Sequence, residues 1–151
     1  MSLSSIPRLP MILGFAGLLP FLITSAAAWL APMAWQVVAI KAFVYYSAVI
    51  LSFLGGVQWG VAMTGDSPKG SPFRTRMLLA MVPSLIAWPA LLLHPVDTAW
   101  VLAAGFVLVR LHELSREGRT LLPSWYQGMR TLLTLVVLVC HGALVWRLSG
   151  H

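Results

Sequence analysis

Charged residues are scarce in this chain. Only 9% of its 151 residues are Asp, Glu, Lys or Arg, whereas 59% are hydrophobic and the mean hydropathy is +0.86. A soluble domain has about 25% charged residues, so this chain has too little charge to cover a surface that faces water. The sequence therefore predicts an integral membrane protein, with lipid as the solvent for most of the chain.

Cysteine and catalytic motifs are scarce as well. The single cysteine, Cys140, excludes an intrachain disulfide framework and any CxxC metal or redox motif. The chain has no HExxH motif, no glycine-rich phosphate loop and no serine with a defined acid partner, so we predict no catalytic residue and no metal site, and the cofactor question stays open. The basic residues form no stripe with stacking aromatics, so nucleic acid is not an expected partner.

Five apolar segments are long enough, or nearly long enough, to cross a bilayer. A spanning helix needs about 20 residues, and about 17 at the short end. We place the spans near residues 9–31, 42–63, 77–93, 96–113 and 129–146, which makes residues 1–151 a single transmembrane domain. The predicted fold is an all-α integral membrane bundle of five transmembrane helices.

Proline and polar residues predict where these helices bend and end. Pro20 lies near the middle of the first span and should bend it. Residues 34–41 either extend the second helix beyond the hydrocarbon core or lie along the membrane interface. Residues 64–76, TGDSPKGSPFRTR, predict a turn-rich polar loop.

The basic residues predict the orientation in the membrane. With five spans, eight of the ten basic residues fall on the side of the N-terminus, and Lys41 and Arg147 fall on the other side. The positive-inside rule then places the N-terminus in the cytoplasm and the C-terminus outside. The eight residues are Arg8, Lys69, Arg74, Arg76, Arg110, Arg116, Arg119 and Arg130.

The stretch from Tyr45 to Gly60 has small and polar residues on two sides of a helix, which is typical of a central helix in a bundle. One side carries Ser47, Leu51, Gly55, Gln58 and Ala62, and the other carries Val49, Ser52, Phe53, Gly56, Gly60 and Met63. We predict that Gly55, Gly56 and Gly60 allow close helix packing.

Gln58 and His141 are the strongest polar candidates inside the spans. Gln58, with Trp59 beside it, either contacts a ligand or ties two helices together. His141 shares a helix face with Thr134, and is either functional, as a proton carrier, haem ligand or headgroup contact, or bonded to Gln58, a backbone carbonyl or water. A haem held by two histidines of one chain is not expected, because the other histidines lie at span ends or at the C-terminus.

His112, Glu113, Arg116 and Glu117 form a small acid–base cluster at the end of the fourth span. It is either a titratable site at the inner membrane surface or a solvated helix end with i,i+3 ion pairs. We favour the solvated helix end.

Four motifs resemble those of a known family. They are LGxAGLLPF at residues 13–21, YxxxILSFLGGVQWG at 46–60, PSLxAW at 83–88 and WYxxMRTxLT at 125–134. In this order they resemble the bacterial and mitochondrial family called domain of unknown function 3429, which includes transmembrane protein 69. The resemblance implies a small multi-span protein of the bacterial or mitochondrial inner membrane, and it implies no reaction.

The sequence therefore favours a non-catalytic accessory or interaction protein that docks onto a larger membrane complex or forms a homo-oligomer. The alternative is a binder of an apolar small molecule, such as a quinone, tetrapyrrole or lipid, within the helix bundle. A transporter is the least favoured class, since the span interiors lack a charged pathway and an inverted repeat. Membrane lipids are expected partners in every case.

Overall fold

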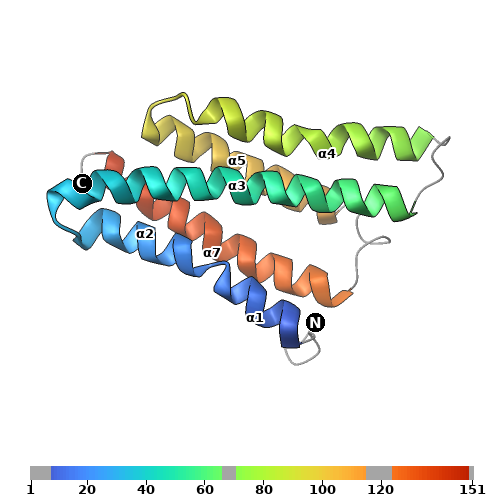
Figure 1. The fold of residues 1–151 in the computed structure, drawn as a ribbon, viewed down its shortest axis with the longest axis horizontal. Helices are drawn as coiled ribbons and strands as arrows, with labels where there is room; N and C mark the ends of the chain where they lie inside the picture. Colours follow the sequence, from blue (N-terminus) through green and yellow to red (C-terminus); the bar gives the residue numbers. More distant parts are fainter. Residues whose placement is uncertain (1–7, 66–70, 115–123, 150–151) are drawn as a thin grey trace.

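The computed structural model describes residues 8–65, 71–114 and 124–149, and these residues are almost entirely helical. α1 and α2 lie end to end, so the helices form five rods that run in alternating directions (Figure 1). The all-α prediction is confirmed. The helices are α1 (Arg8–Ala16), α2 (Leu19–Leu30), α3 (Met33–Gly65), α4 (Ser71–Ala90), α5 (Pro95–Leu114) and α7 (Ser124–Leu148).

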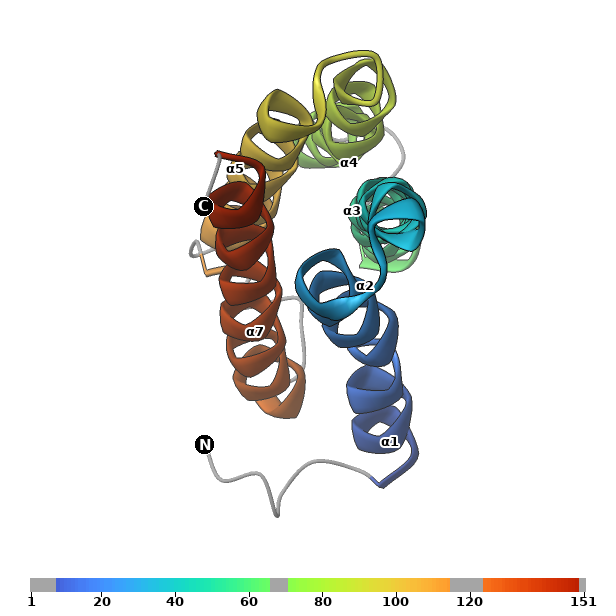
Figure 2. The ribbon, with the colours of Figure 1, turned by 90° about the vertical axis from the view of Figure 1, so that its left-hand side faces the viewer.

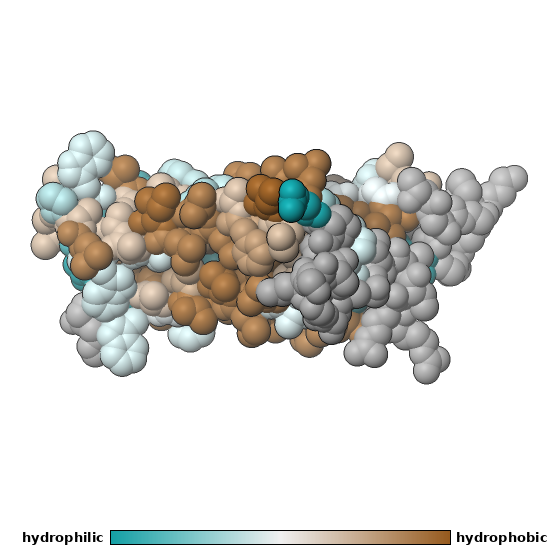
Figure 3. Space-filling view, turned by 90° about the horizontal axis from the view of Figure 1, so that it is seen from below, coloured by the Kyte–Doolittle hydropathy of each residue, from teal (hydrophilic) through white to brown (hydrophobic). Residues whose placement is uncertain are grey.

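Four of the rods are long and apolar enough to cross a membrane. They cover Arg8–Leu30, Met33–Met63, Pro95–Leu114 and Trp125–Leu148. α4 is not among them, and its first two turns carry Arg74 and Arg76. Large hydrophobic side chains face outward, as Figure 3 shows for one face, and Ile23 and Val139 are 63% and 71% exposed. Such a surface matches lipid rather than water.

Several helices are longer than the spans predicted for them, and residues 34–41 extend the second helix, which is one of the two alternatives that the sequence left open. α3 is one continuous helix of 33 residues, about 50 Å long, so it extends beyond a hydrocarbon core of about 30 Å. The loop predicted for residues 64–76 is wrong at residues 71–76, because α4 begins at Ser71. Pro72 lies in its first turn, where a missing N–H breaks no helical bond.

The first rod is broken rather than bent. α1 ends at Ala16 and α2 begins at Leu19, with Pro20 in its first turn, so the proline starts a second helix instead of kinking a single one. The Tyr46 hydroxyl of α3 donates a hydrogen bond of 2.8 Å to the Gly17 carbonyl at this break. The break is thereby attached to α3.

The break changes the neighbours of the first rod. α2 packs against α3 and α7, whereas α1 packs chiefly against α7. Toward the N-terminal end of the molecule α1 therefore diverges from α3 (Figure 1).

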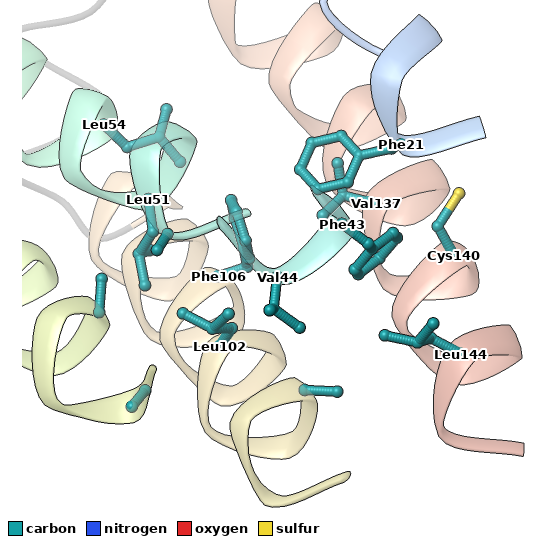
Figure 4. Packing of buried hydrophobic residues seen from close by; sticks show 14 of the residues in the cluster. Phe21, Phe43, Val44, Leu51, Leu54, Leu102, Phe106, Val137, Cys140 and Leu144 are labelled. Carbon is teal, nitrogen blue, oxygen red and sulfur yellow. The ribbon is translucent and has the colours of Figure 1, made fainter. Parts of the chain in front are cut away.

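The rods form a ring. Viewed end-on, α2, α3, α4, α5 and α7 follow one another around the bundle, and α3 also contacts α5 across it (Figure 2). Phe21, Phe43 and Phe106 come from three different helices and meet in the core, with ring centroids 5.5 Å apart for Phe21 and Phe43 (Figure 4). α3 contacts α2, α4 and α5, but its side with Val49 and Phe53 is exposed, so the interpretation of α3 as a central helix packed on both sides is wrong for that side.

Tyr46→Phe should destabilise the protein by about 1 kcal/mol, the usual contribution of one hydrogen bond, because the Gly17 carbonyl loses its donor. Unfolding in mixed detergent micelles, followed by circular dichroism, measures this change. Tyr45→Phe is the matched control, since the neighbouring Tyr45 is 53% exposed and should show no loss. Equal losses for the two variants would contradict a role for this bond.

Candidate functional site

A buried ion pair joins α5 to α7 near the end of the bundle where α1 begins. The Arg130 guanidinium donates from Nε to both oxygens of Glu113 at 3.1 Å, and from Nη2 to Oε1 at 2.8 Å. Glu113 is 1% exposed and Arg130 is 5% exposed. The two-point geometry makes this a strong, specific contact.

Arg110 extends this cluster with neutral partners. Its Nη1 donates to Gln127 Oε1 at 2.9 Å, and its Nη2 donates to the Gln127 carbonyl at 2.9 Å and to Thr131 Oγ1 at 2.7 Å. The Gln127 amide in turn donates to the Glu113 carbonyl at 3.1 Å. The cluster therefore holds two guanidinium groups and one carboxylate, and its side chains connect α5 to α7.

The cluster corrects the solvated helix end that the sequence favoured. Glu113 is buried and pairs with Arg130 on another helix, not with Arg110 on its own helix. Arg116 and Glu117 lie outside the described residues. The sequence contained a signal for this cluster: polar and charged residues gather at the two helix ends that flank one short connection. These residues are Arg110, Glu113, Gln127 and Arg130.

An apolar groove of about 430 Å³ ends at this cluster. We call it the Arg130 groove. Its polar end is formed by Trp125, Tyr126 and Arg130. Arg130 Nη1 makes no hydrogen bond to any residue in the described ranges. The apolar walls come from α1, α2, α3, α5 and α7, and include Leu13, Phe21, Phe53, Leu54, Phe106 and Val137.

The groove results from the broken first rod. Its rim residues Leu13 of α1 and Phe53 of α3 are exposed, whereas Phe21, Leu54 and Val137 along its floor are buried. The groove therefore opens between α1 and α3, where these helices diverge after the break at Gly17. In a bilayer this opening faces lipid.

His141 lies in the centre of the bundle and binds Ser47. His141 Nδ1 lies 2.7 Å from the Val137 carbonyl, which can only accept, so Nδ1 carries the proton. Nε2 then accepts from the Ser47 hydroxyl at 2.7 Å. Both side chains are at most 1% exposed, and the imidazole is packed among Phe21, Phe43 and Phe106. This pair ties α3 to α7.

Gln58 is remote from His141 and makes no hydrogen bond to any residue the structure describes. It lines a separate cavity of about 240 Å³ between α3, α4 and α5. Pro83, Gly105 and His112 are among the other lining residues. Of the two interpretations of Gln58, the hydrogen bond that joins two helices is therefore not formed within the described residues.

The other candidates do not gather around one site. Trp59 is exposed on α3. Thr134 is buried on α7, and its hydroxyl has no partner in the part of the chain that is described. His, Cys, Asp and Glu residues form no group of three that could hold a metal ion in residues 8–65, 71–114 and 124–149.

The three glycines of α3 face different surroundings. A Cβ at Gly55 would lie 2.6 Å from the Ala80 carbonyl, so the absence of a side chain permits close contact with α4. A Cβ at Gly56 or Gly60 would meet no heavy atom within 4 Å. The side of α3 that carries Gly56 faces outward, with Val49 and Phe53 more than 60% exposed.

Comparisons with known proteins agree with the four motifs. Residues 6–146 match the model of a family described as protein of unknown function, DUF3429. Over 138 residues the chain is 37% identical to transmembrane protein 69 of Xenopus tropicalis, covering 89% of this chain and 53% of the relative. The mouse protein of the same name is 28% identical over 139 residues, covering 88% and 54%. The chain thus spans about half the length of these relatives. No solved structure shows significant similarity.

Removing one partner of the buried ion pair should be strongly destabilising. Glu113→Gln or Arg130→Gln should each lower the free energy of unfolding by about 3–5 kcal/mol, because the remaining charge loses its counter-ion. The double variant should lose much less than the sum, which unfolding in mixed micelles measures.

Asp97→Asn is the control for this cycle, since Asp97 is exposed in the first turn of α5 and its replacement should change stability by less than about 0.5 kcal/mol. Strictly additive losses in the double variant would contradict the pairing.

Proposed function

Since the chain belongs to the DUF3429 family and is a small multi-span membrane protein, we propose that it binds an apolar, lipid-like small molecule in the Arg130 groove. One observation carries the proposal: an apolar groove open toward lipid ends at a polar, largely buried cluster. Amphipathic ligands have this division, with an apolar body and a polar head. The proposal assigns no reaction to the protein.

The size of the groove supports this choice of site. Its volume of about 430 Å³ falls within the range of about 300–1,000 Å³ that is usual for small-molecule sites. The Gln58 cavity, at about 240 Å³, falls below that range.

A third cavity has no Lys or Arg among its lining residues. It has a volume of about 590 Å³ and lies between α5 and α7, with Trp100 and Trp146 in its walls. His141 also lines it, but both imidazole nitrogens are already engaged, with Ser47 and with the Val137 carbonyl. Only the Arg130 groove combines adequate volume with an available charged donor among these three cavities.

The outward side of α3 favours a second candidate, an accessory role in a larger membrane complex. Gly56 lies there beside exposed Phe53 and Val49, and a transmembrane helix of another subunit could approach Gly56 closely. We rank this role second, because lipid chains can cover the same surface equally well.

The proposal includes five spans, with the N-terminus in the cytoplasm and the C-terminus outside, in a bacterial inner membrane or, in a eukaryote, the mitochondrial inner membrane. Arg74, Arg76, Arg110 and Arg130 lie toward the end of the bundle where α1 begins, and Arg147 lies toward the other end, which supports this orientation.

Fusions in a bacterial host test the orientation. Alkaline phosphatase joined after His151 should be active, because the enzyme folds only outside the cytoplasm, and green fluorescent protein at the same position should be dark. Fusions after Gly65, where α3 ends, should give the reverse pattern: inactive alkaline phosphatase and fluorescent green fluorescent protein. A cytoplasmic reading at His151 would contradict the orientation.

Filling the groove should displace the ligand. Leu133 lines the groove, so Leu133→Trp should reduce the lipid-like molecule that is retained after detergent washing by at least about tenfold. Mass spectrometry of the molecules released from the denatured protein measures retention per chain.

Leu135→Trp is the matched control for this experiment, since Leu135 lies on the same helix but is 57% exposed and does not line the groove. Equal retention by both variants, or no retained molecule in the unaltered protein, would contradict ligand binding in the groove.

A further inference from the structure

We propose that the ligand of the Arg130 groove is a single-chain amphipath with an anionic head, a carboxylate or a phosphate, whose head binds Arg130. This inference rests on the proposed function and adds the chemical class of the ligand. It follows from the free donor on Arg130, the charge of the cluster and the shape of the groove.

Arg130 has donor capacity that the protein does not use. A guanidinium carries five N–H donors on three nitrogens. Nε and Nη2 donate to Glu113, whereas Nη1 has no partner among the described residues. Only 5% of the Arg130 surface is exposed, and the residue lines the groove. An unpaired donor of a charged group is costly in such surroundings, so an acceptor supplied by a ligand would be strongly favoured.

The charge of the cluster favours an anion over a neutral acceptor. Arg110 and Arg130 are both positive, and Glu113 is the one carboxylate that pairs with them in the described chain. Arg110 has only the neutral partners Gln127 and Thr131 in that part of the chain. The only other described acidic residue, Asp97, begins α5 at the opposite end of the bundle. Within the described residues, one positive charge of this cluster thus has no counter-ion.

The rest of the groove fits an apolar chain. Between Tyr126 and Val137 it follows α7 for about 16 Å, calculated from the rise per residue of a helix. Beyond the polar end its lining is hydrophobic, apart from glycine and proline. A volume of about 430 Å³ lies toward the lower end of the range for small-molecule sites, which favours one chain over a two-chain lipid.

The depth of Arg130 favours a small head. Arg130 lies six residues after Ser124, so it is about 9 Å along α7 from the helix start. A bulky zwitterionic headgroup would have to leave water to reach it. A carboxylate or phosphate can instead exchange its water for charge-assisted hydrogen bonds to the guanidinium.

Photoreactive probes distinguish the head groups. The purified full chain, in phosphatidylcholine nanodiscs, is incubated with three diazirine-bearing probes of equal chain length: hexadecanoic acid, its methyl ester and hexadecyl phosphate. After illumination, mass spectrometry gives the labelled fraction and the labelled peptides. We expect labelling of α3 and α7, with an apparent affinity for at least one of the two anions about tenfold above that for the ester.

The two anionic probes distinguish a ligand with a carboxylate head from a ligand with a phosphate head. Preference for the acid identifies a carboxylate, as in a free fatty acid, and preference for the phosphate identifies a phosphorylated chain. Equal labelling of the groove by all three probes overturns the anionic head but leaves the proposed function intact. Failure of all three to label the groove overturns both.

Variants locate the head. Arg130→Gln combined with Glu113→Gln leaves the net charge of the cluster at one positive charge, because Arg110 remains. A fall in the preference for the anion to about twofold or less therefore reports the loss of the Arg130 donors rather than a change of charge. Arg147→Gln is the matched control, because Arg147 lies at the other end of α7, where it bonds to Gln36 and Ala28, and should keep the full preference. A preference that persists in the folded double variant overturns the assignment to Arg130. The probe comparison on the unaltered chain tests the anionic head even if that variant does not fold.

Discussion

The ion pair between Glu113 and Arg130 is the contact on which the site depends. In a lipid-like interior a single buried charge is very costly, and a pair is tolerated only when its geometry is good. The three short contacts between these groups therefore allow little variation in how α5 and α7 lie against each other. The bonds of Gln127 and Arg110 depend on the same alignment of α5 and α7. Arg110 of α5 donates to Gln127 of α7, and Gln127 donates to the Glu113 carbonyl of α5. The polar end of the groove is thus built as a unit.

A backbone constraint in the first rod determines where the groove lies. Pro20 has no N–H to continue a helix through the preceding turn, and the rod divides at Gly17 and Leu18. Because Tyr46 attaches the break to α3, α2 can pack on α3 while α1 diverges from it. A continuous first helix would lie along α3 and leave less room for a groove. A proline and a tyrosine thereby position a cavity whose chemistry comes from α5 and α7.

The sequence predicted the helical fold but not the site, and the reason is physical. Membrane helices follow from composition and length, because lipid leaves the backbone few alternatives. Whether Glu113 faces water or Arg130 depends on how α5 and α7 are aligned, and no pattern within either helix determines that. His141 illustrates the same limit: its histidine chemistry was evident, but Ser47 as partner, 94 residues away, was not. Gln58 was correctly singled out as a polar residue in an apolar helix, and only the structure reveals that no described residue binds it.

Unused hydrogen-bonding capacity separates structural polar groups from candidate binding groups. Ser47, His141 and Tyr46 are engaged with one another or with backbone carbonyls, so they stabilise contacts between helices. Thr134 Oγ1 and Arg110 Nε also lack partners in the described chain, but neither residue lines one of the three cavities. Gln58 and Arg130 combine a free donor with a cavity. Only Arg130 adds a charge, and a charged donor gains more from a partner than a neutral amide does. The chemistry of the ligand should therefore be determined chiefly at Arg130.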